Sequence, residues 1–443
     1  MNKYALFFIY LFIHSPFIFS QNTDTTFFKG NYSFNVDSII VTGNDITEKE
    51  VILTELTFKI GDLVTPEILK YNRERIYSLR IFTNVNLIPF RNNKKYIINI
   101  KVEESWYIYP TPFIHIKDRD WNKLSYGMSL MVFNFRGRNE KLKFVGALGY
   151  DPKLDLSYSV PYLTYKSKIS FEGGVRLQRV KNKSNIAKKL WGGDFDQTIR
   201  SGRLFLGKRF GTYIRVGIST AYTTIETSKY IKGISASNSR IDHLFTLAFY
   251  YSYDTRDLSQ FPREGMYASS LLQLKGLGID GISYQVLNFD LRKYFKLNDD
   301  LSFKWRFASR LTFGSLIPYY DNSYIGFHER IRGHFRQELE GNNSYIGSAE
   351  VDYALFKDIN LNLDFIPIIP KQLLKYRIGL YLQLFADTGM IQNKNEPLSI
   401  NKLNSGYGIG LTLLLLPYNV LRLERAWDEY GNPEWIFDVG VSF

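Results

Sequence analysis

Alternating strands dominate the sequence after residue 105 and leave few folds open to it. The runs at 243–253, 303–313, 377–387 and 435–443 place apolar or aromatic side chains at every second position, with polar or charged ones between them. A period of two is typical of a β-strand with one apolar face. Each run is about 10 residues long, which is the length that a strand needs to cross a membrane within a barrel.

No stretch after the first 20 residues is apolar for long enough to cross a membrane as a helix. The most apolar runs, at 411–416 and 365–369, fall far short of the ~20 residues required. If the mature chain lies in a membrane, it must form a closed barrel, because only helices and barrels satisfy their backbone hydrogen bonds in lipid. A soluble β-sandwich also alternates, but it rarely places Arg and Lys so regularly opposite aromatic side chains. We therefore predict an all-β barrel over residues 106–443, with about sixteen antiparallel strands at about 21 residues per strand and turn.

Composition and charge agree with a membrane barrel. Aromatic residues make up 16% of the chain, which favours strands. The formal net charge of +13 suits either nucleic acid or an anionic membrane surface. Because the basic residues are scattered through the aromatic strands, the membrane is favoured and no nucleic-acid partner is expected. The absence of cysteine excludes disulfides and thiolate metal sites.

Residues 1–20 predict a secretory signal peptide. A short positive start at Met1-Asn2-Lys3 precedes an apolar run to Phe19, which His14 and Pro16 interrupt. Cleavage is expected near Ser20, although the large Ile18 leaves its position open and a retained anchor is the alternative.

Residues 34–105 predict a small α+β domain with the order β-α-α-β-β. A strand at 34–42 ends in a Gly-Asn turn, and Thr47 to Glu50 resembles a capping box that begins a short helix. Pro66 begins a second helix. Strands follow at 82–90 and 96–102.

This region resembles a POTRA domain, the periplasmic module of the Omp85 superfamily. The likeness rests on Val41-Thr42-Gly43-Asn44, Gly61-Asp62 and the segment 79–85. Any small α+β domain could share the order of elements, so these turns carry the resemblance. A sheet of this kind leaves an open edge that can accept an extended chain, and the expected partners are unfolded polypeptide clients or a periplasmic protein.

The second region resembles the Omp85 barrel itself. Ile331-Arg332-Gly333 is similar to the tip of the family's long sixth loop, although His334 stands where an aromatic residue is usual. Gly347–Glu350 and Phe385–Gly389 are similar to blocks of the two following strands. A further block predicts a structural turn through Asp254, Arg256, Asp257, Pro262 and Gly265. Arg136-Gly137-Arg138 is a competing Arg-Gly segment, which we interpret as a hairpin turn.

The resemblance implies that the loop tip folds into the lumen. The alternation places Glu350 and Asp387 on the lumen face independently of any family. We therefore expect Arg332 to act as a loop latch with Glu350 and Asp387 as its acceptors, and Gly333 to allow close approach. We predict no metal site and no catalytic residues in this chain.

The final strand resembles the β-signal that assembly machinery recognises on outer-membrane proteins. The predicted signal residues are Trp435, Phe437, Val441 and Phe443. In Omp85 assembly factors this strand pairs weakly with the first, which forms a lateral gate; the sequence does not show whether that seam opens.

Two functions stay open on the resemblance. The first is an outer-membrane assembly or translocation factor that captures clients by POTRA strand addition and passes them to the barrel. The alternative is a passive pore or surface-attachment barrel. A barrel hydrolase is disfavoured because no histidine lies in a Ser/His/Asp motif. No enzyme activity and no cofactor are expected, since the chain shows no ligand-spaced His pair and no Gly-rich phosphate loop.

Overall fold

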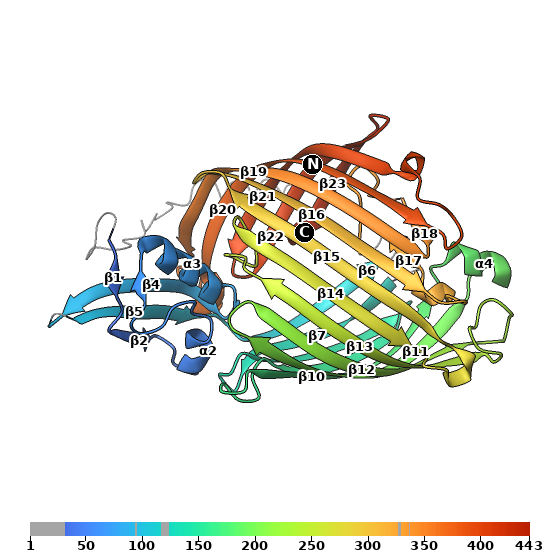
Figure 1. Ribbon diagram of the computed structural model, residues 1–443, viewed down its shortest axis with the longest axis horizontal. Coiled ribbons are helices and arrows are strands. Elements are labelled where there is room, and N and C mark those ends of the chain that lie inside the picture. The colour runs from blue at the N-terminus through green and yellow to red at the C-terminus, as the bar shows by residue number, and fades with distance from the viewer. Residues whose placement is uncertain (1–31, 94, 117–123, 327–328, 336) are drawn as a thin grey trace.

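The protein consists of a large barrel with a small domain at one of its ends (Figure 1). The computed structural model describes residues 32–93, 95–116, 124–326, 329–335 and 337–443. The predicted signal peptide lies outside the described residues.

The small N-terminal domain packs two helices against a three-stranded sheet. In the sheet, β2 is parallel to β5 and β4 is antiparallel to it, while β1 and β3 form a separate pair. Ile52, Ile76, Ile98 and Ile100 are fully buried between the layers. The elements are β1 (Phe34–Asn35), β2 (Ser38–Thr42), α2 (Lys49–Leu53), β3 (Leu63–Val64), α3 (Pro66–Tyr77), β4 (Phe82–Asn92) and β5 (Lys95–Glu104).

Two local predictions for this domain were wrong. The expected single strand at 34–42 is divided, because the chain crosses from pairing with β3 to pairing with β5. The expected capping box does not form: Glu48 is the N-cap residue and makes no side-chain cap. The Thr47 hydroxyl instead donates to Glu104 at 2.6 Å. The hydrogen bond to Glu104, which is distant in sequence, therefore forms in place of the local helix cap.

The barrel wall is one antiparallel sheet of sixteen strands in the part of the chain that the structure describes, which confirms the predicted fold class. Neighbours in sequence pair throughout, and β16 pairs with β19 across a long loop. The strands are β6 (Ile108–Ile116), β7 (Leu124–Phe135), β8 (Glu140–Gly149), β9 (Lys153–Val160), β10 (Ile169–Lys181), β11 (Asp196–Phe210), β12 (Ile214–Thr227), β13 (Ile241–Asp254), β14 (Gly265–Lys275), β15 (Tyr284–Lys296), β16 (Leu301–Phe313), β19 (Asn343–Asn362), β20 (Lys375–Gln392), β21 (Asn404–Leu416), β22 (Asn419–Asp428) and β23 (Pro433–Val439).

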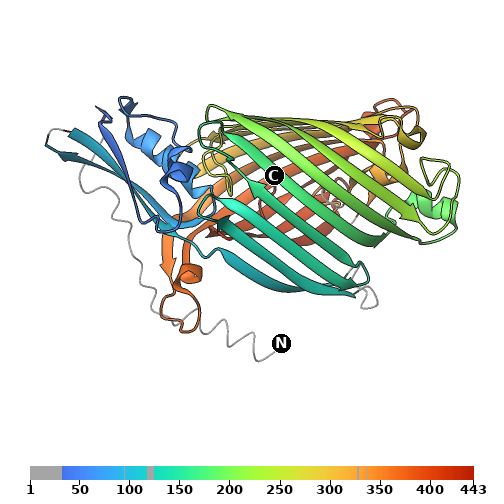
Figure 2. The ribbon, with the colours of Figure 1, turned by 90° about the horizontal axis from the view of Figure 1, so that it is seen from below.

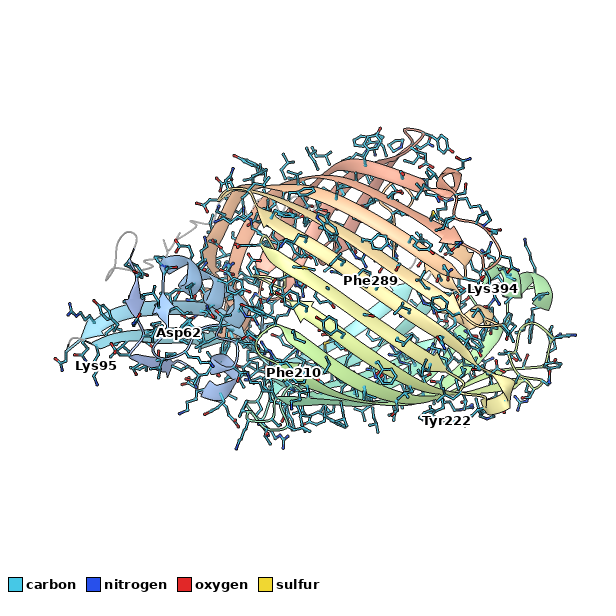
Figure 3. All side chains as sticks on the ribbon, in the orientation of Figure 1. Asp62, Lys95, Phe210, Tyr222, Phe289 and Lys394 are labelled. Carbon is cyan, nitrogen blue, oxygen red and sulfur yellow. The ribbon has the colours of Figure 1, made fainter. Side chains whose placement is uncertain are left out.

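The two faces of the wall differ as the alternation predicts. Phe210, Tyr222 and Phe289 stand on the outer face (Figure 3). Lys304 and Glu350 are buried on the inner face. No helix among the described residues is long and apolar enough to span a membrane.

The two ends of the barrel are closed differently. Short turns meet the N-terminal domain at one end, which Figure 2 shows packed against the barrel. The opposite end carries longer loops with α4 (Asn185–Trp191), η3 (Ile279–Gly281), η4 (Tyr319–Asp321) and η6 (Ile400–Lys402). The loop between β16 and β19 also holds a two-stranded sheet of β17 (Ser323–Ile325) and β18 (Leu339–Gly341). A hairpin containing η5 (Lys371–Leu374) joins β19 to β20 near the domain.

The sheet has two ends that do not meet through a strand ladder. Among the described residues, β6 pairs only with β7 and β23 pairs only with β22. We call the boundary between β6 and β23 the seam. Beside the seam, the ring of Tyr109 on β6 contacts the ring of Tyr418, which lies in the turn between β21 and β22, with centroids 6.2 Å apart.

Candidate functional site

The tip of the loop between β16 and β19 lies inside the barrel. Ile331 is fully buried and packs with Ile325 and Ile346. This small apolar cluster holds the loop against the inner wall next to Arg332. The side chain of Arg332 therefore enters the lumen from a fixed backbone rather than from a free loop.

Arg332 is surrounded by carboxylates, and the side chain is only 6% exposed. Its Nε and Nη2 atoms donate to the two oxygens of Asp387 at 2.7 and 2.8 Å, so this contact is bidentate. Its Nη1 atom donates to Glu350 at 2.8 Å and to Glu424 at 3.1 Å. The guanidinium also lies 3.7 Å from the ring centroid of Phe385. The structure thus brings together the three charged residues that we assigned from the sequence and adds a fourth.

Gly333 sits where the loop tip touches the wall. Its φ is +101°, and a Cβ built there would lie 2.6 Å from the carbonyl oxygen of Trp427. Gly406 on β21 lies opposite the loop tip, and a Cβ on it would lie 1.7 Å from the carbonyl oxygen of Arg332. Two glycines facing each other therefore permit the close approach.

The tip also contacts β23. The backbone N–H groups of Gly333 and Phe335 both donate to Glu434, at 2.7 and 2.9 Å. His334, which replaces the usual aromatic residue, pairs with Glu429 at 2.5 Å. Phe335 takes up the aromatic packing one position later, against the cluster of Phe385, Ala426 and Ile436. The loop tip is thereby held by β19, β20, β22 and β23.

The carboxylates around Arg332 also pair with other charged side chains of the lumen. The ammonium of Lys304 lies 2.5 Å from Glu350 and 3.1 Å from Asp352, and both carboxylates are fully buried. Gln383 donates to the same two carboxylates. Arg422 pairs with Glu424 at 2.9 Å. Sequence reasoning missed Lys304, Glu424 and Arg422, although each occupies an inward position of an alternating strand.

Of the predicted β-signal residues, only some follow the outward pattern. Trp435 and Phe437 are exposed on the outer face of β23. Val441 and Phe443 lie beyond the strand, which ends at Val439. The ring of Phe443 is buried, with the ammonium of Lys304 5.4 Å from its centroid. The alternation that we extended to Phe443 therefore stops short of it.

The predicted turn block forms a tight turn that also docks the N-terminal domain. Arg256 donates to both oxygens of Asp254, at 2.9 and 2.7 Å. Gly265 has a φ of +107°, and a Cβ there would lie 2.2 Å from the carbonyl oxygen of Thr255. Pro262 is buried in the turn. The Ser259 N–H donates to Ser78 at 2.9 Å, and the Tyr71 hydroxyl donates to the Thr255 carbonyl at 3.0 Å.

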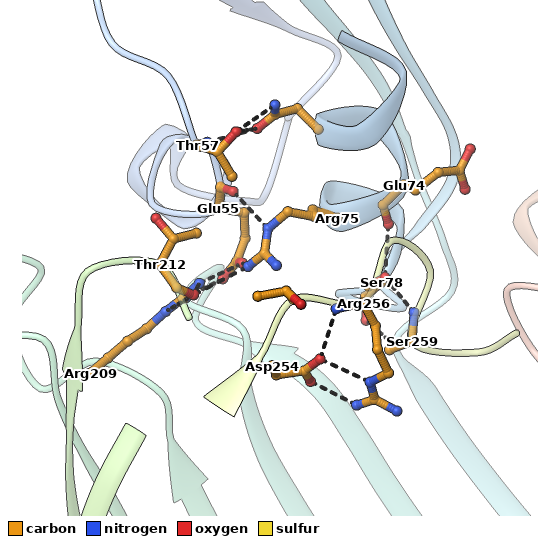
Figure 4. A network of polar contacts seen from close by, with 12 residues as sticks. Glu55, Thr57, Glu74, Arg75, Ser78, Arg209, Thr212, Asp254, Arg256 and Ser259 are labelled. Atoms are coloured by element: carbon orange, nitrogen blue, oxygen red, sulfur yellow. Dashed lines mark hydrogen bonds and ion pairs between the residues drawn. The ribbon is translucent and has the colours of Figure 1, made fainter. Parts of the chain in front are cut away.

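Buried ion pairs fix the same interface (Figure 4). Glu55 of the N-terminal domain pairs with Arg75 at 3.0 Å and with Arg209 of β11 at 2.5 Å. Glu74 pairs with Arg377 of β20 at 2.7 Å. Burial opposes ionisation of Glu74, but Arg377 and Arg73 outweigh it and lower the pKa of the carboxyl to about 2. The apolar core of the domain continues into barrel residues Leu258, Phe261, Tyr381, Leu414 and Leu416.

We expect the folded protein to be more stable below neutral pH because of Asp257 in this turn. Burial raises the pKa of its carboxyl to about 6, against hydrogen bonds from the N–H groups of Leu258, Arg263 and Glu264, and Glu74 adds to the rise. A raised folded-state pKa gives stability that is present at low pH and lost as pH rises through about 6. Lowering the pH from 7.5 to 5 should therefore stabilise the folded protein against unfolding by about 1 kcal/mol, at 1.36 kcal/mol per pKa unit. Thermal unfolding across this range checks it, and Asp257→Asn should remove the difference; an unchanged slope in that variant contradicts the assignment.

Family comparisons agree with this geometry. The description "Surface antigen variable number repeat", a POTRA family, matches residues 34–105. The description "Omp85 superfamily domain" matches residues 134–443, well over half of the chain. The chain belongs to the Omp85 superfamily. As an Omp85 barrel it lies in the outer membrane with its POTRA domain in the periplasm, and it is a non-enzymatic assembly or transport barrel.

Solved structures show the same fold at low sequence identity. The crystal structure of BamA from Haemophilus ducreyi lacking POTRA domains 1–3 is 17% identical with a TM-score of 0.53, covering 92% of this chain and 84% of that one. CdiB from Escherichia coli is 11% identical with a TM-score of 0.53, covering 91% and 75%. No curated protein matches the sequence.

The charged site consists of side chains that are already paired with one another. No group of three or more His, Asp or Glu among the described residues is placed to hold a metal ion. The carboxylates that could do so are already bound to Arg332, Lys304 and Arg422. Among the described residues, strand edges without a neighbouring strand lie at two places, the seam and the β2 edge of the POTRA sheet.

Proposed function

We propose that this Omp85 protein is an assembly or translocation factor for polypeptides of the outer membrane. It captures an unfolded client at the POTRA domain and passes it to the barrel. The observation that carries the proposal is the unpaired seam. A passive pore gains from closing its sheet completely, because unpaired backbone groups in lipid are costly, whereas an unpaired edge can accept an incoming strand.

The loop latch acts on the wall beside that seam. Arg332 ties the loop to β19, β20 and β22, and the backbone around Gly333 ties it to Glu434 of β23. We infer that the latch holds the strands on the β23 side of the seam in one arrangement. The β6 side of the seam stays free to move. Client folding supplies the free energy, so no nucleotide or cofactor is required.

The POTRA sheet offers the capture edge. Among the described residues, β2 pairs only with β5, so its other edge has no strand beside it. Ile40 on β2 is 41% exposed. The opposite edge strand β4 contacts β20 of the barrel, and Lys375 of β20 pairs with Glu103 of the neighbouring β5 at 2.8 Å. Strand addition at β2 therefore leaves the docked interface intact.

A photoreactive amino acid at Ile40 tests this capture. We expect it to form adducts with a urea-unfolded eight-stranded outer-membrane barrel protein, at several times the yield obtained from Lys95, the first residue of β5. Lys95 lies at the far tip of the same domain, so it controls for random collision (Figure 3). Equal yields from the two positions would show that β2 is not the capture edge.

Depletion separates this function from the alternative of a passive pore or surface-attachment barrel. Loss of the protein from cells should lower the amounts of folded β-barrel proteins or secreted polypeptides. If depletion changes only solute permeability or surface attachment, the alternative is correct.

A further inference from the structure

The hairpin that joins β19 to β20 carries an apolar tip at the POTRA end of the barrel. The tip spans residues 363–371, Leu-Asp-Phe-Ile-Pro-Ile-Ile-Pro-Lys, with one aspartate and one lysine as its charged residues. Three of its large apolar side chains face solvent, since Phe365 is 70% exposed, Ile369 is 44% exposed and Ile368 is fully exposed. A cluster of exposed apolar side chains marks a surface that meets a protein or a membrane.

Hydrogen bonds within the loop give the tip a defined shape. The Leu363 N–H donates to the Leu374 carbonyl at 2.9 Å, and the Ile366 N–H donates to the Leu363 carbonyl at 2.9 Å. Ile368 has a φ of +79°, which is an unfavourable conformation for a β-branched residue. Backbone strain of this kind is typical of positions with a functional role. The exposure of Ile368 is therefore a built feature of the hairpin.

The hairpin departs from the direction of the barrel wall. The pairing of β19 with β20 shifts register between Ala354 and Phe356, and again between Phe356 and Ile359. Bulges of this kind bend a strand. In Figure 2 the hairpin, drawn in orange, projects sideways from the POTRA end of the barrel and does not continue along the barrel axis. Because the barrel crosses the membrane, a segment that projects sideways at its periplasmic end lies along the periplasmic leaflet.

The outer apolar face of the wall leads into this hairpin. Tyr353 pairs with Leu301, the first residue of β16, and so stands at the periplasmic rim of the wall. Leu355 and Phe356 lie beyond the pairing with β16, and both are exposed like Tyr353. The apolar surface that meets lipid on the barrel therefore continues past the rim and towards the tip.

Charged side chains hold the base of the hairpin in place. Lys357 pairs at 2.5 Å with Asp300, which lies in the turn between β15 and β16. Asp358 pairs with Arg377 at 3.1 Å, and Arg377 also pairs with Glu74 of the POTRA domain at 2.7 Å. The direction of the tip is therefore fixed relative to both the barrel and the POTRA domain.

We propose that the tip is a membrane anchor that inserts Phe365, Ile368 and Ile369 into the periplasmic leaflet of the outer membrane. Lys371 then lies among the phospholipid headgroups, since an exposed apolar cluster beside a cation is typical of segments in a bilayer interface. A phospholipid surface fits better than a protein, because the tip projects over the membrane and its apolar surface continues that of the lipid-facing wall. Through the ion pairs at its base, the anchor also sets the orientation of the POTRA domain to the membrane. This inference does not depend on the client proposed above.

Crosslinking to lipid tests the anchor in the full-length protein. The protein is reconstituted in vesicles of phosphatidylethanolamine and phosphatidylglycerol that include a phospholipid with a diazirine in its acyl chain. After illumination, trypsin releases residues 358–371, which contain the tip, and residues 60–70 of the POTRA domain, where Ile60 is 65% exposed. We expect the fraction of 358–371 with a lipid adduct to be about fivefold that of 60–70 or more, because an interfacial segment buries its apolar side chains among acyl chains.

Equal fractions on the two peptides would overturn the inference, because the tip would then lie in water. That result would instead favour a periplasmic protein as the partner of the tip, since the purified system contains lipid and no such protein.

A charged tip provides the second test. In Phe365→Asp/Ile368→Asp, we expect the adducts on 358–371 to fall to the level of 60–70, because burial of an ionised carboxylate among acyl chains is strongly unfavourable. Ile60→Asp is the matched control and should leave the adducts on 358–371 unchanged. Retained heat-modifiable migration shows that each variant is folded. Undiminished adducts on 358–371 in the folded double variant would overturn the proposal.

Discussion

Replacing Arg332 with alanine is expected to abolish most client assembly while leaving the barrel inserted in the membrane. The variant removes the cation that lies between Glu350, Asp387 and Glu424, all of which are buried. Glu350 keeps Lys304 and Glu424 keeps Arg422 as partners, so Asp387 is the buried carboxylate left without a cation, and losing one partner of a buried pair costs about 3–5 kcal/mol. The loop tip should therefore leave the lumen, while the sixteen-stranded ladder, which does not include the tip, should remain.

The measurement combines protease sensitivity of the loop with the rate of client folding in vesicles. Arg330→Ala is the matched control, because Arg330 lies in the same loop and stacks 4.1 Å from the centroid of Phe335 without being among the partners of Asp387. We expect the control to retain a protected loop and nearly normal folding rates. Wild-type activity of the Arg332 variant, with an undisturbed loop, would remove the latch assignment.

The barrel and the centre of its site could be predicted because they depend on a local rule. A period of two fixes which side chains face the lumen, so Glu350 and Asp387 were identifiable without any structure. The same rule places Glu424 inward on the strand that carries Leu421 and Leu423, and only the absence of a recognised motif hid it. Pairing with Arg332 spans 92 positions in the sequence and has no local signal.

The misjudged regions are those in which distant contacts overrule the local pattern. Alternation continues to Phe443, but the strand ends at Val439 and Gly440 adopts a φ of +110°, a conformation that favours glycine. The ring of Phe443 then packs against Lys304, which lies far away in sequence. Contact between Glu74 and Arg377, across 303 positions, likewise could not be foreseen. The docking of the POTRA domain against the barrel can consequently be recognised only from the structure and not from the sequence.

That docking can be weakened at a single residue. Glu55→Ala is expected to release the POTRA domain from its fixed position, because it leaves Arg75 and Arg209 facing each other without their shared carboxylate. Burial disfavours the charged form of Glu55, yet Arg209 and Arg75 lower the pKa of its carboxyl, so the pair is ionised at neutral pH. Loss of one partner of a buried pair costs about 3–5 kcal/mol.

The absence of cysteine makes the experiment direct. Spin labels on Lys95→Cys in the POTRA domain and on Tyr430→Cys at the far end of the barrel report their separation by double electron–electron resonance. We expect one narrow distance distribution in the parent chain and a broad one in Glu55→Ala.

Glu67→Ala serves as the control, since Glu67 is an exposed carboxylate on α3 of the same domain, and it should keep the distribution narrow. If Glu55→Ala also stays narrow, then the remaining Glu74–Arg377 pair and the shared apolar core suffice to hold the domain. Delivery of clients would then have to occur without movement of the POTRA domain. A broad distribution with slowed client folding would instead show that the fixed position of the domain is needed to pass a strand from β2 to the seam.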